Sequence, residues 1–349
     1  MTTRTSRRRA LTATAIAVAL TTGTSVALTG SASAQPAAST ATTVSLATGQ
    51  YQSAYSERND VLWVTTAVGR NANPSALLKV DPRTLTVEQS ITPPVANPTT
   101  GALEAVYGVA VDDEHNTVWV TNTRVNTVAV YSQRTGEHLA TLPDVAHARE
   151  IVVDEKHDTV WASAYGGGTL VAYDSKTLTE KKRVTVEGSG PAGLAVDEKS
   201  GTVYATDLTN DRIIEVTRAS DTPRLIPAGD GPISIALSRN GRTAYTADQT
   251  GGTLSVVDLR TGTVTRTVTT GAGALSVAAS DRSGDVVVVN RTAATATVVD
   301  PGKGVVEETV PTGTNPNHVE ITDGVAYVVD KSGAGENGAD TLTVIDLAH

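Results

Sequence analysis

An apolar run centred on an aromatic side chain recurs about every 42 residues, and this repeat restricts the fold more than any other feature. Successive centres are 56, 42, 43, 41, 42 and 40 residues apart. Periods of this size are typical of repeat architectures in which neighbouring copies bury each other's apolar faces. Seven copies account for nearly the whole chain after residue 42. Their centres are Trp63, Trp119, Trp161, Tyr204, Tyr245, Val287 and Tyr327.

Each copy contains four short runs that have the pattern of β-strands. In the second copy, residues 107–111, 117–121, 126–131 and 138–142 alternate between apolar and polar side chains, with turn residues between them. Alternation with a period of two predicts strands rather than helices. Four strands in about 40–45 residues match one propeller blade. We therefore expect an all-β fold, a seven-bladed β-propeller of four-stranded antiparallel blades.

The last copy lacks one strand, and the beginning of the chain offers a replacement. Residues 317–321, 325–329 and 341–347 supply three runs, and residues 43–47 (TVSLA) supply an unassigned fourth. Pairing the two ends of the chain in one blade would close the ring and remove two open sheet edges. The prediction is a single propeller domain over residues 43–349, preceded by a flexible N-terminus over residues 35–42.

The first 34 residues have the three parts of a secretory signal. A basic start is followed by a small, apolar, uncharged stretch over residues 10–28 and by the cleavage-type sequence Ser-Ala-Ser-Ala at residues 31–34. Residues 6–11 (SRRRAL) resemble the twin-arginine export motif, and a Sec signal with a generous basic start is the alternative. The prediction is a secreted, extracellular or cell-envelope protein. Cleavage removes four Arg and no acidic residue, which takes the net charge from −9 to −13.

Composition excludes several classes of function. The chain has no Cys, so it has no disulfide, thiolate metal site or Cys nucleophile. An excess of acidic residues opposes binding to nucleic acid or anionic lipid. No stretch after residue 34 reaches the roughly 20 apolar residues of a membrane span. We predict no cofactor; the acidic loop with Asp330, Glu336 and Asp340 permits a divalent cation, but no metal-binding motif supports one.

Several copies resemble the YVTN-repeat (YncE-like) β-propeller family. The segments YGVAVD (residues 107–112), VWVTN (118–122), PAGLAVD (191–197) and TLTVID (341–346) carry the resemblance, which extends over all seven copies. It implies an exported or surface propeller and says little about function. Related propellers include streptogramin lyases and lactonases. Single-stranded nucleic-acid binding is known among YncE-like propellers, but the charge of this chain opposes it.

The residues that begin each first strand are expected to line the mouth of the central channel. The third and seventh copies place Arg149-Glu150 and Asn317-His318 where the others have mostly small or apolar residues. Glu150 and His318 could act as acid and base or share a metal, and Arg149 could hold an anion. A solvated lining with an Arg149–Glu150 pair is the plainer alternative. The aligned pairs are Tyr51/Gln52, Tyr107/Gly108, Arg149/Glu150, Ala192/Gly193, Ile233/Ser234, Leu275/Ser276 and Asn317/His318.

Three unusually long connections are predicted to lie together on the channel-mouth face, in neighbouring blades. They are residues 66–75, 92–105 and 330–340, and neutral loop drift is the alternative to a binding role. Tyr165, in a Gly-rich loop on this face, could stack on a ligand. A polar ring that ends the second strands is attributed mainly to turn chemistry. It consists of Thr66, Asn122, Ala164, Asp207, Asp248, Asn290 and Asp330.

Two further interpretations concern the Trp and His side chains. The three Trp are expected in the blade core, whereas His115 and His157 are expected to be solvated.

The preferred function is an exported scaffold that binds an extracellular small molecule, glycan or protein through this face. The alternative is a lyase- or lactonase-like enzyme with His318 as acid/base, Glu150 as base or metal ligand and Arg149 on substrate charge. We predict no resident metal. The ligand-binding candidates are Tyr51, Gln52, Arg70, Tyr107, Arg149, Glu150, Tyr165, Asn317, His318 and Lys331.

Overall fold

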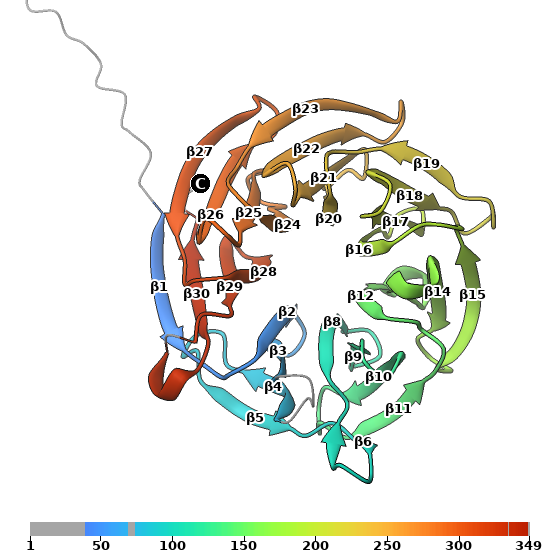
Figure 1. The fold of residues 1–349 in the computed structure, drawn as a ribbon, viewed down its shortest axis with the longest axis vertical. Coiled ribbons are helices and arrows are strands. Elements are labelled where there is room, and N and C mark those ends of the chain that lie inside the picture. The colour runs from blue at the N-terminus through green and yellow to red at the C-terminus, as the bar shows by residue number, and fades with distance from the viewer. Residues whose placement is uncertain (1–38, 69–73, 334, 348–349) are drawn as a thin grey trace, which may run out of the picture. The chain divides into compact units, whose positions relative to one another are not determined.

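The computed structural model describes residues 39–68, 74–333 and 335–347. Within them, seven four-stranded antiparallel sheets follow one another around a central axis, as Figure 1 shows. The innermost strands of neighbouring blades contact each other all the way around, including blade 7 against blade 1. The predicted seven-bladed β-propeller is therefore confirmed. The predicted signal sequence lies outside the described residues.

Blades 1–4 each use four consecutive strands, from the innermost to the outermost. Blade 1 consists of β2 (Gln50–Ser56), β3 (Val61–Ala67), β4 (Ser75–Val80) and β5 (Val87–Ile91). Blade 2 consists of β8 (Val106–Asp112), β9 (Thr117–Asn122), β10 (Thr127–Ser132) and β11 (His138–Leu142). Blade 3 consists of β12 (Ala148–Asp154), β13 (Thr159–Ala164), β14 (Thr169–Asp174) and β15 (Thr179–Thr185). Blade 4 consists of β16 (Pro191–Asp197), β17 (Thr202–Asp207), β18 (Arg212–Val216) and β19 (Arg224–Pro227).

Blades 5 and 6 repeat this order, and blade 7 takes its outer strand from the N-terminus. Blade 5 consists of β20 (Pro232–Leu237), β21 (Thr243–Asp248), β22 (Thr253–Asp258) and β23 (Thr263–Thr269). Blade 6 consists of β24 (Ala274–Ala279), β25 (Val286–Asn290), β26 (Thr295–Asp300) and β27 (Val305–Pro311). Blade 7 consists of β28 (Pro316–Thr322), β29 (Val325–Asp330), β30 (Thr341–Asp346) and β1 (Thr40–Ser45).

Short elements occupy some connections. Residues 92–105, predicted as a loop, contain the two-stranded hairpin of β6 (Val95–Asn97) and β7 (Ala102–Leu103). Three single-turn 3₁₀ helices are η1 (Glu155–His157), η2 (Tyr165–Gly167) and η3 (Glu336–Gly338). No helix among the described residues has the length and apolar character needed to cross a membrane.

The ring closes through the two ends of the chain. Strand β1 pairs antiparallel with β30, in a register that places Thr43 opposite Thr343 and joins their hydroxyls at 3.0 Å. Closure by the N-terminal strand is thus observed, although β1 begins at Thr40 rather than residue 43. Asp340 anchors the next turn, because its Oδ2 accepts the backbone N–H groups of Gly49 (2.7 Å) and Gln50 (3.1 Å).

The apolar core lies between blades, as the repeat predicts. Trp63, Trp119 and Trp161 are at most 2% exposed, which confirms the prediction that they are core residues. Trp63 of blade 1 packs with Val118 and other apolar side chains of blade 2, and its Nε1 donates to Gln133 of that blade (3.2 Å). Because a single blade cannot cover both of its faces, each blade depends on its neighbours for burial.

The polar ring at the ends of the second strands is buried rather than confined to exposed turns. Asp207 does cap its own turn, since it accepts from the Thr209 N–H (3.3 Å), but it also accepts from the Gly190 N–H (2.8 Å) in front of β16. Asp248 instead accepts from Thr246 and Ser255, both at 2.7 Å. Turn chemistry therefore explains this ring only in part. The ring residues also hold neighbouring segments in place, because they bond to the segments before the inner strands and to side chains of the third strands.

Candidate functional site

Every inner strand carries a β-bulge at the same end. In blade 1, Gln50 pairs with Thr66 and Ser53 pairs with Val64, so one extra residue lies in β2. An equivalent break in register occurs in the inner strands of the other six blades. A bulge locally re-aims side chains. The bulges coincide with the residue pairs that sequence alignment placed at the channel mouth.

These bulged segments surround a cavity of about 530 Å³. All fourteen aligned residues line it, among them Tyr51, Gln52, Tyr107, Arg149, Glu150, Asn317 and His318. Of the other predicted candidates, Tyr165 and Lys331 contact lining residues without lining the cavity, and Arg70 lies outside the described residues. The lining residues that the sequence analysis missed are Thr123, Arg124, His147, Leu208, Gln249 and Arg291.

A signal for most of the missed residues is present in the repeat. Leu208, Gln249 and Arg291 each directly follow a member of the buried polar ring, and so do Thr123, Tyr165 and Lys331. In blades 2, 4, 5 and 6 this next residue lines the cavity, and in blades 3 and 7 it contacts a lining residue. Extending the alignment by one position would have found them.

Hydroxyl groups on the second strands hold the bulges of neighbouring blades together. The Thr121 hydroxyl accepts from the backbone N–H of Gly108 and donates to the backbone carbonyl of Arg149, both at 2.8 Å. Gly108 is required there, since a Cβ would lie 2.4 Å from that carbonyl oxygen. Equivalent donations run from Thr65 to the Tyr107 carbonyl (2.5 Å) and from Ser163 to the Ala192 carbonyl (2.7 Å).

Two arginines at the mouth lie over aromatic rings. The Arg124 guanidinium is 5.8 Å from the centre of the Tyr107 ring, and that of Arg149 is 5.3 Å from the centre of the Tyr165 ring. Such contacts stabilise a cation without neutralising its charge. His147, beside them, has its pKa lowered by burial and by Arg149.

Two more cations lie where blades 6, 7 and 1 meet. Arg291 donates to the side chain of Asn317 (2.6 Å), and the Lys331 ammonium lies 3.8 Å from the centre of the Tyr51 ring. Burial lowers the pKa of Lys331 to about 8, so the amine is still mostly charged at neutral pH. Within the described chain, no carboxylate oxygen lies within 4.0 Å of the cationic groups of Arg124, Arg149, Arg291 or Lys331.

Glu150 turns away from Arg149 and toward the channel. Its Oε2 accepts from the side-chain amide of Gln52 (2.9 Å), and the Oε1 atom of Gln52 in turn accepts from the Val109 N–H (3.2 Å). The Arg149–Glu150 ion pair, the plainer alternative of the sequence analysis, does not form. Burial raises the pKa of Glu150 to about 7, so this carboxyl is near half-protonation at neutral pH.

His318 lies at the junction of blades 7 and 1. Its Nδ1 accepts from the backbone N–H of Ser53 (3.3 Å), and burial lowers its pKa to about 4. The imidazole is therefore neutral at physiological pH. Glu320, two residues along β28, was not predicted; burial and the nearby Glu150 raise its pKa to about 7. A second cavity of about 410 Å³ lies further along the channel. Glu150 and His318 line both cavities, and Glu320 lines the second one.

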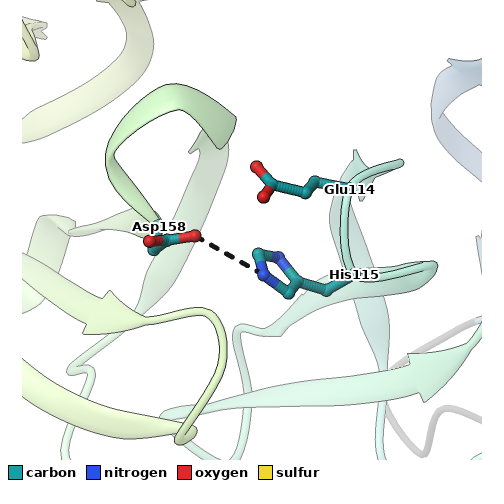
Figure 2. A group of neighbouring side chains, drawn as sticks. All are labelled: Glu114, His115 and Asp158. Carbon is teal, nitrogen blue, oxygen red and sulfur yellow. Dashed lines mark ion pairs between the residues drawn. The ribbon is translucent and has the colours of Figure 1, made fainter.

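The described residues contain one cluster with the composition of a metal site, away from the cavity. Glu114, His115 and Asp158 gather between the first hairpins of blades 2 and 3, as Figure 2 shows. The His115 Nε2 lies 3.5 Å from Asp158. Asp158 already accepts from the ammonium of Lys176 (2.8 Å), which supplies a positive charge there. We assign the cluster no metal.

The first-hairpin histidines are paired rather than solvated as predicted. His115 contacts the buried Asp112 at 2.8 Å, and His157 contacts the buried Asp154 at the same distance. Their side chains are only 18% and 13% exposed. Each Asp sits three residues before its His, so the hairpin brings them together and the pair fills the space beneath it.

Comparison with known proteins identifies similar folds. No protein-family model and no curated protein sequence matches the chain. Among solved structures, virginiamycin B lyase from Staphylococcus aureus is similar with a TM-score of 0.72 and 13% identity, over 89% of this chain and 100% of that one. A streptogramin B lyase structure is similar with a TM-score of 0.72 and 14% identity, over 88% and 98%. At this identity the likeness shows the propeller fold alone; the YVTN-repeat assignment stays a prediction.

Proposed function

We propose that this propeller is a binding protein for a small organic anion, held at the channel mouth. The observation that carries the proposal is a group of four cations in a chain with a net charge of −9: Arg124, Arg149 and Arg291 line one cavity, and Lys331 lies against the lining residue Tyr51. They contact aromatic rings, amides and a backbone carbonyl rather than carboxylates. Arginine forks suit carboxylate and phosphate groups.

The size and charge of the site favour a small molecule over the other predicted partners. A cavity of about 530 Å³ falls in the range of about 300–1,000 Å³ for ligand pockets. A nucleic acid would require a long basic track, whereas this chain has 28 Lys and Arg against 37 Asp and Glu, and several cations outside the mouth are paired with carboxylates. The cationic lining therefore supports a small molecule as the ligand, rather than a glycan or a protein.

Calorimetric titration of the purified protein tests the proposal. Probes are sulfate, phosphate, benzoate and octanoate. We expect at least one of them to bind, and the Arg149→Gln change to weaken binding at least about tenfold, since a charged hydrogen bond contributes about 1.5–3 kcal/mol. Lys303→Gln removes the same charge from an exposed outer turn and should leave binding unchanged. The proposal would be refuted if none of the four anions binds, or if Arg149→Gln and Lys303→Gln lose the same amount of anion affinity.

An enzyme of lyase or lactonase type is the second candidate. It is supported by the half-protonated Glu150 at the cavity, because a pKa near the working pH suits a general acid or base. In this function Glu150 transfers the proton and Arg149 binds substrate charge; His318 would have to act through Nε2, because Nδ1 accepts from Ser53. A panel of lactones and lyase substrates, with and without a divalent ion, tests it. Turnover that Glu150→Gln abolishes supports an enzyme, and no turnover removes this candidate.

We also propose that the protein acts after export, either outside the cell or at its envelope. The basic, apolar and small-residue segments of residues 1–34 support this. Replacing Arg7, Arg8 and Arg9 by Lys should block export through the twin-arginine route and leave a Sec route working. Export is measured as the fraction of protein in the culture medium or envelope. Retention of the native chain inside the cell would contradict the proposal.

A further inference from the structure

The channel mouth has two chemically different halves. At the bulges, blades 1, 2, 3 and 7 carry large polar or charged side chains, whereas blades 4, 5 and 6 carry apolar ones. Because the seven positions are structurally equivalent, the difference comes from residue type alone. The first group is Tyr51, Tyr107, Arg149 and Asn317, and the second is Ala192, Ile233 and Leu275.

Among the residues that follow the second strands of blades 4 to 6, Leu208 adds to the apolar group, whereas Gln249 of blade 5 and Arg291 of blade 6 are polar or charged. Blade 4 contributes Leu208, where blades 3 and 7 have Tyr165 and Lys331. Arg291 belongs to blade 6 but leans toward blade 7, because its guanidinium donates to Asn317 (2.6 Å). The apolar half is defined as Ala192, Leu208, Ile233 and Leu275; it includes one bulge residue from each of blades 4 to 6, and Gln249 lies at its edge.

Small residues accompany the apolar side chains in the lining of this half. Gly193 and Ser234 lie beside the apolar side chains, and a Cβ on Gly193 would lie 2.7 Å from the Cα of Ser234. Leu208 and Leu275 are half-buried, so part of each side chain faces the cavity space. An inorganic anion would leave these surfaces in water, whereas an apolar group placed against them would be transferred out of water, which is favourable.

We propose that the ligand is an amphipathic organic anion, with its anionic head against Arg124, Arg149 and Arg291 and its apolar body against the apolar half. This inference rests on the proposed function and deepens it by naming the ligand class. Alkyl and aryl carboxylates share this chemistry with the phosphate and sulfate esters of apolar alcohols. Arg124 and Arg149 come from blades 2 and 3, across the ring from Ile233 and Leu275 of blades 5 and 6, and Arg291 lies at the edge of the apolar half next to blade 7.

A homologous series of carboxylates tests the inference. Acetate, butyrate, hexanoate and octanoate differ only in apolar length. We expect affinity to rise roughly two- to fourfold per added methylene, and at least about 50-fold from acetate to octanoate, as surface is buried. 1-Octanol, which lacks the charge, should bind at least about tenfold more weakly than octanoate. This comparison needs only the native protein.

Two variants locate the body of the ligand. Leu275→Ser and Leu208→Ser should reduce the octanoate-to-acetate affinity ratio at least about threefold, with folding checked by thermal unfolding. Val305→Ser is the control, on an exposed outer strand. If inorganic anions and acetate bind as tightly as octanoate, the inference is wrong and the proposed function stands. If no anion binds, or 1-octanol equals octanoate, the proposed function itself fails.

Discussion

The Nδ1 atom of His318 accepts a 3.3 Å hydrogen bond from the backbone N–H of Ser53, which joins the inner strand of blade 7 to that of blade 1. These residues are 265 positions apart in the chain. The carboxyl of Glu320 makes a similar contact with the backbone N–H of Tyr55, two residues further along each strand. The ring is thus held at its closing junction from inside as well as by β1 on the outside.

The first prediction concerns this inner contact. His318→Ala leaves the Ser53 N–H without its acceptor in a buried position, so we expect the free energy of unfolding to fall by about 1–3 kcal/mol. His318→Gln, whose side chain can accept the same hydrogen bond, should recover part of the loss. The measurement is urea unfolding near pH 7.5. His138→Ala, on the exposed part of β11, serves as control and should change stability by less than about 0.5 kcal/mol.

The second prediction concerns the pH dependence of stability. Because the pKa of Glu320 is raised to about 7 in the folded chain, folding takes up a proton between about pH 4.5 and 7, where the unfolded carboxyl is ionised and the folded one is protonated. Burial of Glu320 therefore lowers the free energy of unfolding by an amount that grows as pH rises from about 4.5 to 7 and is constant above pH 7. Glu320→Gln removes it, so the variant should be about 2–3 kcal/mol more stable than the native chain near pH 8 and about equal to it near pH 4.5.

His318 changes stability with pH in the opposite direction to Glu320. The test therefore compares the native chain with a variant that keeps His318. Its folded pKa of about 4 lies below the unfolded value near 6.5, so its contribution is complete above about pH 6.5 and is lost as pH falls toward 4. This contribution is common to the native chain and Glu320→Gln, and cancels in their difference. Glu137→Gln, an exposed carboxyl, is the control. A stability difference that does not depend on pH would contradict the assignment to Glu320.

The architecture was predictable because the repeat itself encodes it. An apolar aromatic slot every 42 or so residues requires a neighbour to cover it, and Trp63 and Trp119 lie buried where that argument places them. Closure followed from counting strands, and β1 pairs with β30 as expected. The predicted start of the closing strand was three residues too late, because Thr40 and Thr42 are polar and show no apolar alternation. Their strand character comes from backbone pairing to β30 rather than from burial.

The site was predictable in position and less so in chemistry. Aligning the first strands of the seven copies identified the residue pairs that line the cavity. The spacing of the repeat does not show which neighbour each side chain contacts. Glu150 bonds to Gln52 from blade 1, and Arg149 lies over Tyr165 from its own blade. His115 was misjudged because its partner Asp112 becomes buried only when the hairpin packs between blades. Such contacts depend on three-dimensional packing that one sequence does not display.

The third prediction tests the contact between bulges. In Gly108→Ala the new methyl group would lie 2.4 Å from the Arg149 carbonyl and 2.8 Å from the Thr121 hydroxyl, so blades 2 and 3 must separate. We expect a loss of at least about 2 kcal/mol in stability, as for other overpacked sites, and weaker anion binding. Gly167→Ala, where the nearest atom would be 3.5 Å away, is the matched control. A native-like melting temperature in Gly108→Ala would show that the two blades tolerate separation.

The last prediction tests closure by the chain ends. The Asp340 carboxylate accepts three backbone N–H groups, from Gly49 (2.7 Å), Gln50 (3.1 Å) and Gly333 (2.8 Å). Asp340→Ala removes all three acceptors beside β1, and we expect a loss of about 3–5 kcal/mol in the free energy of unfolding. Deleting residues 35–45 removes β1 itself and exposes the edge of β30, which should lower the melting temperature further and promote association between chains.

Asp346→Ala, at the exposed end of β30, is the control for Asp340→Ala and should change stability by less than about 0.5 kcal/mol. Calorimetry gives the melting temperatures, and light scattering gives the association state. Among the described strands, β1 alone is an outer strand that does not directly follow its neighbour in the chain, so its loss should affect blade 7 before the rest of the ring. Hydrogen exchange should therefore rise first in β30 and β29. A truncated chain that stays monomeric and melts with the native protein would show that β1 is dispensable for closure.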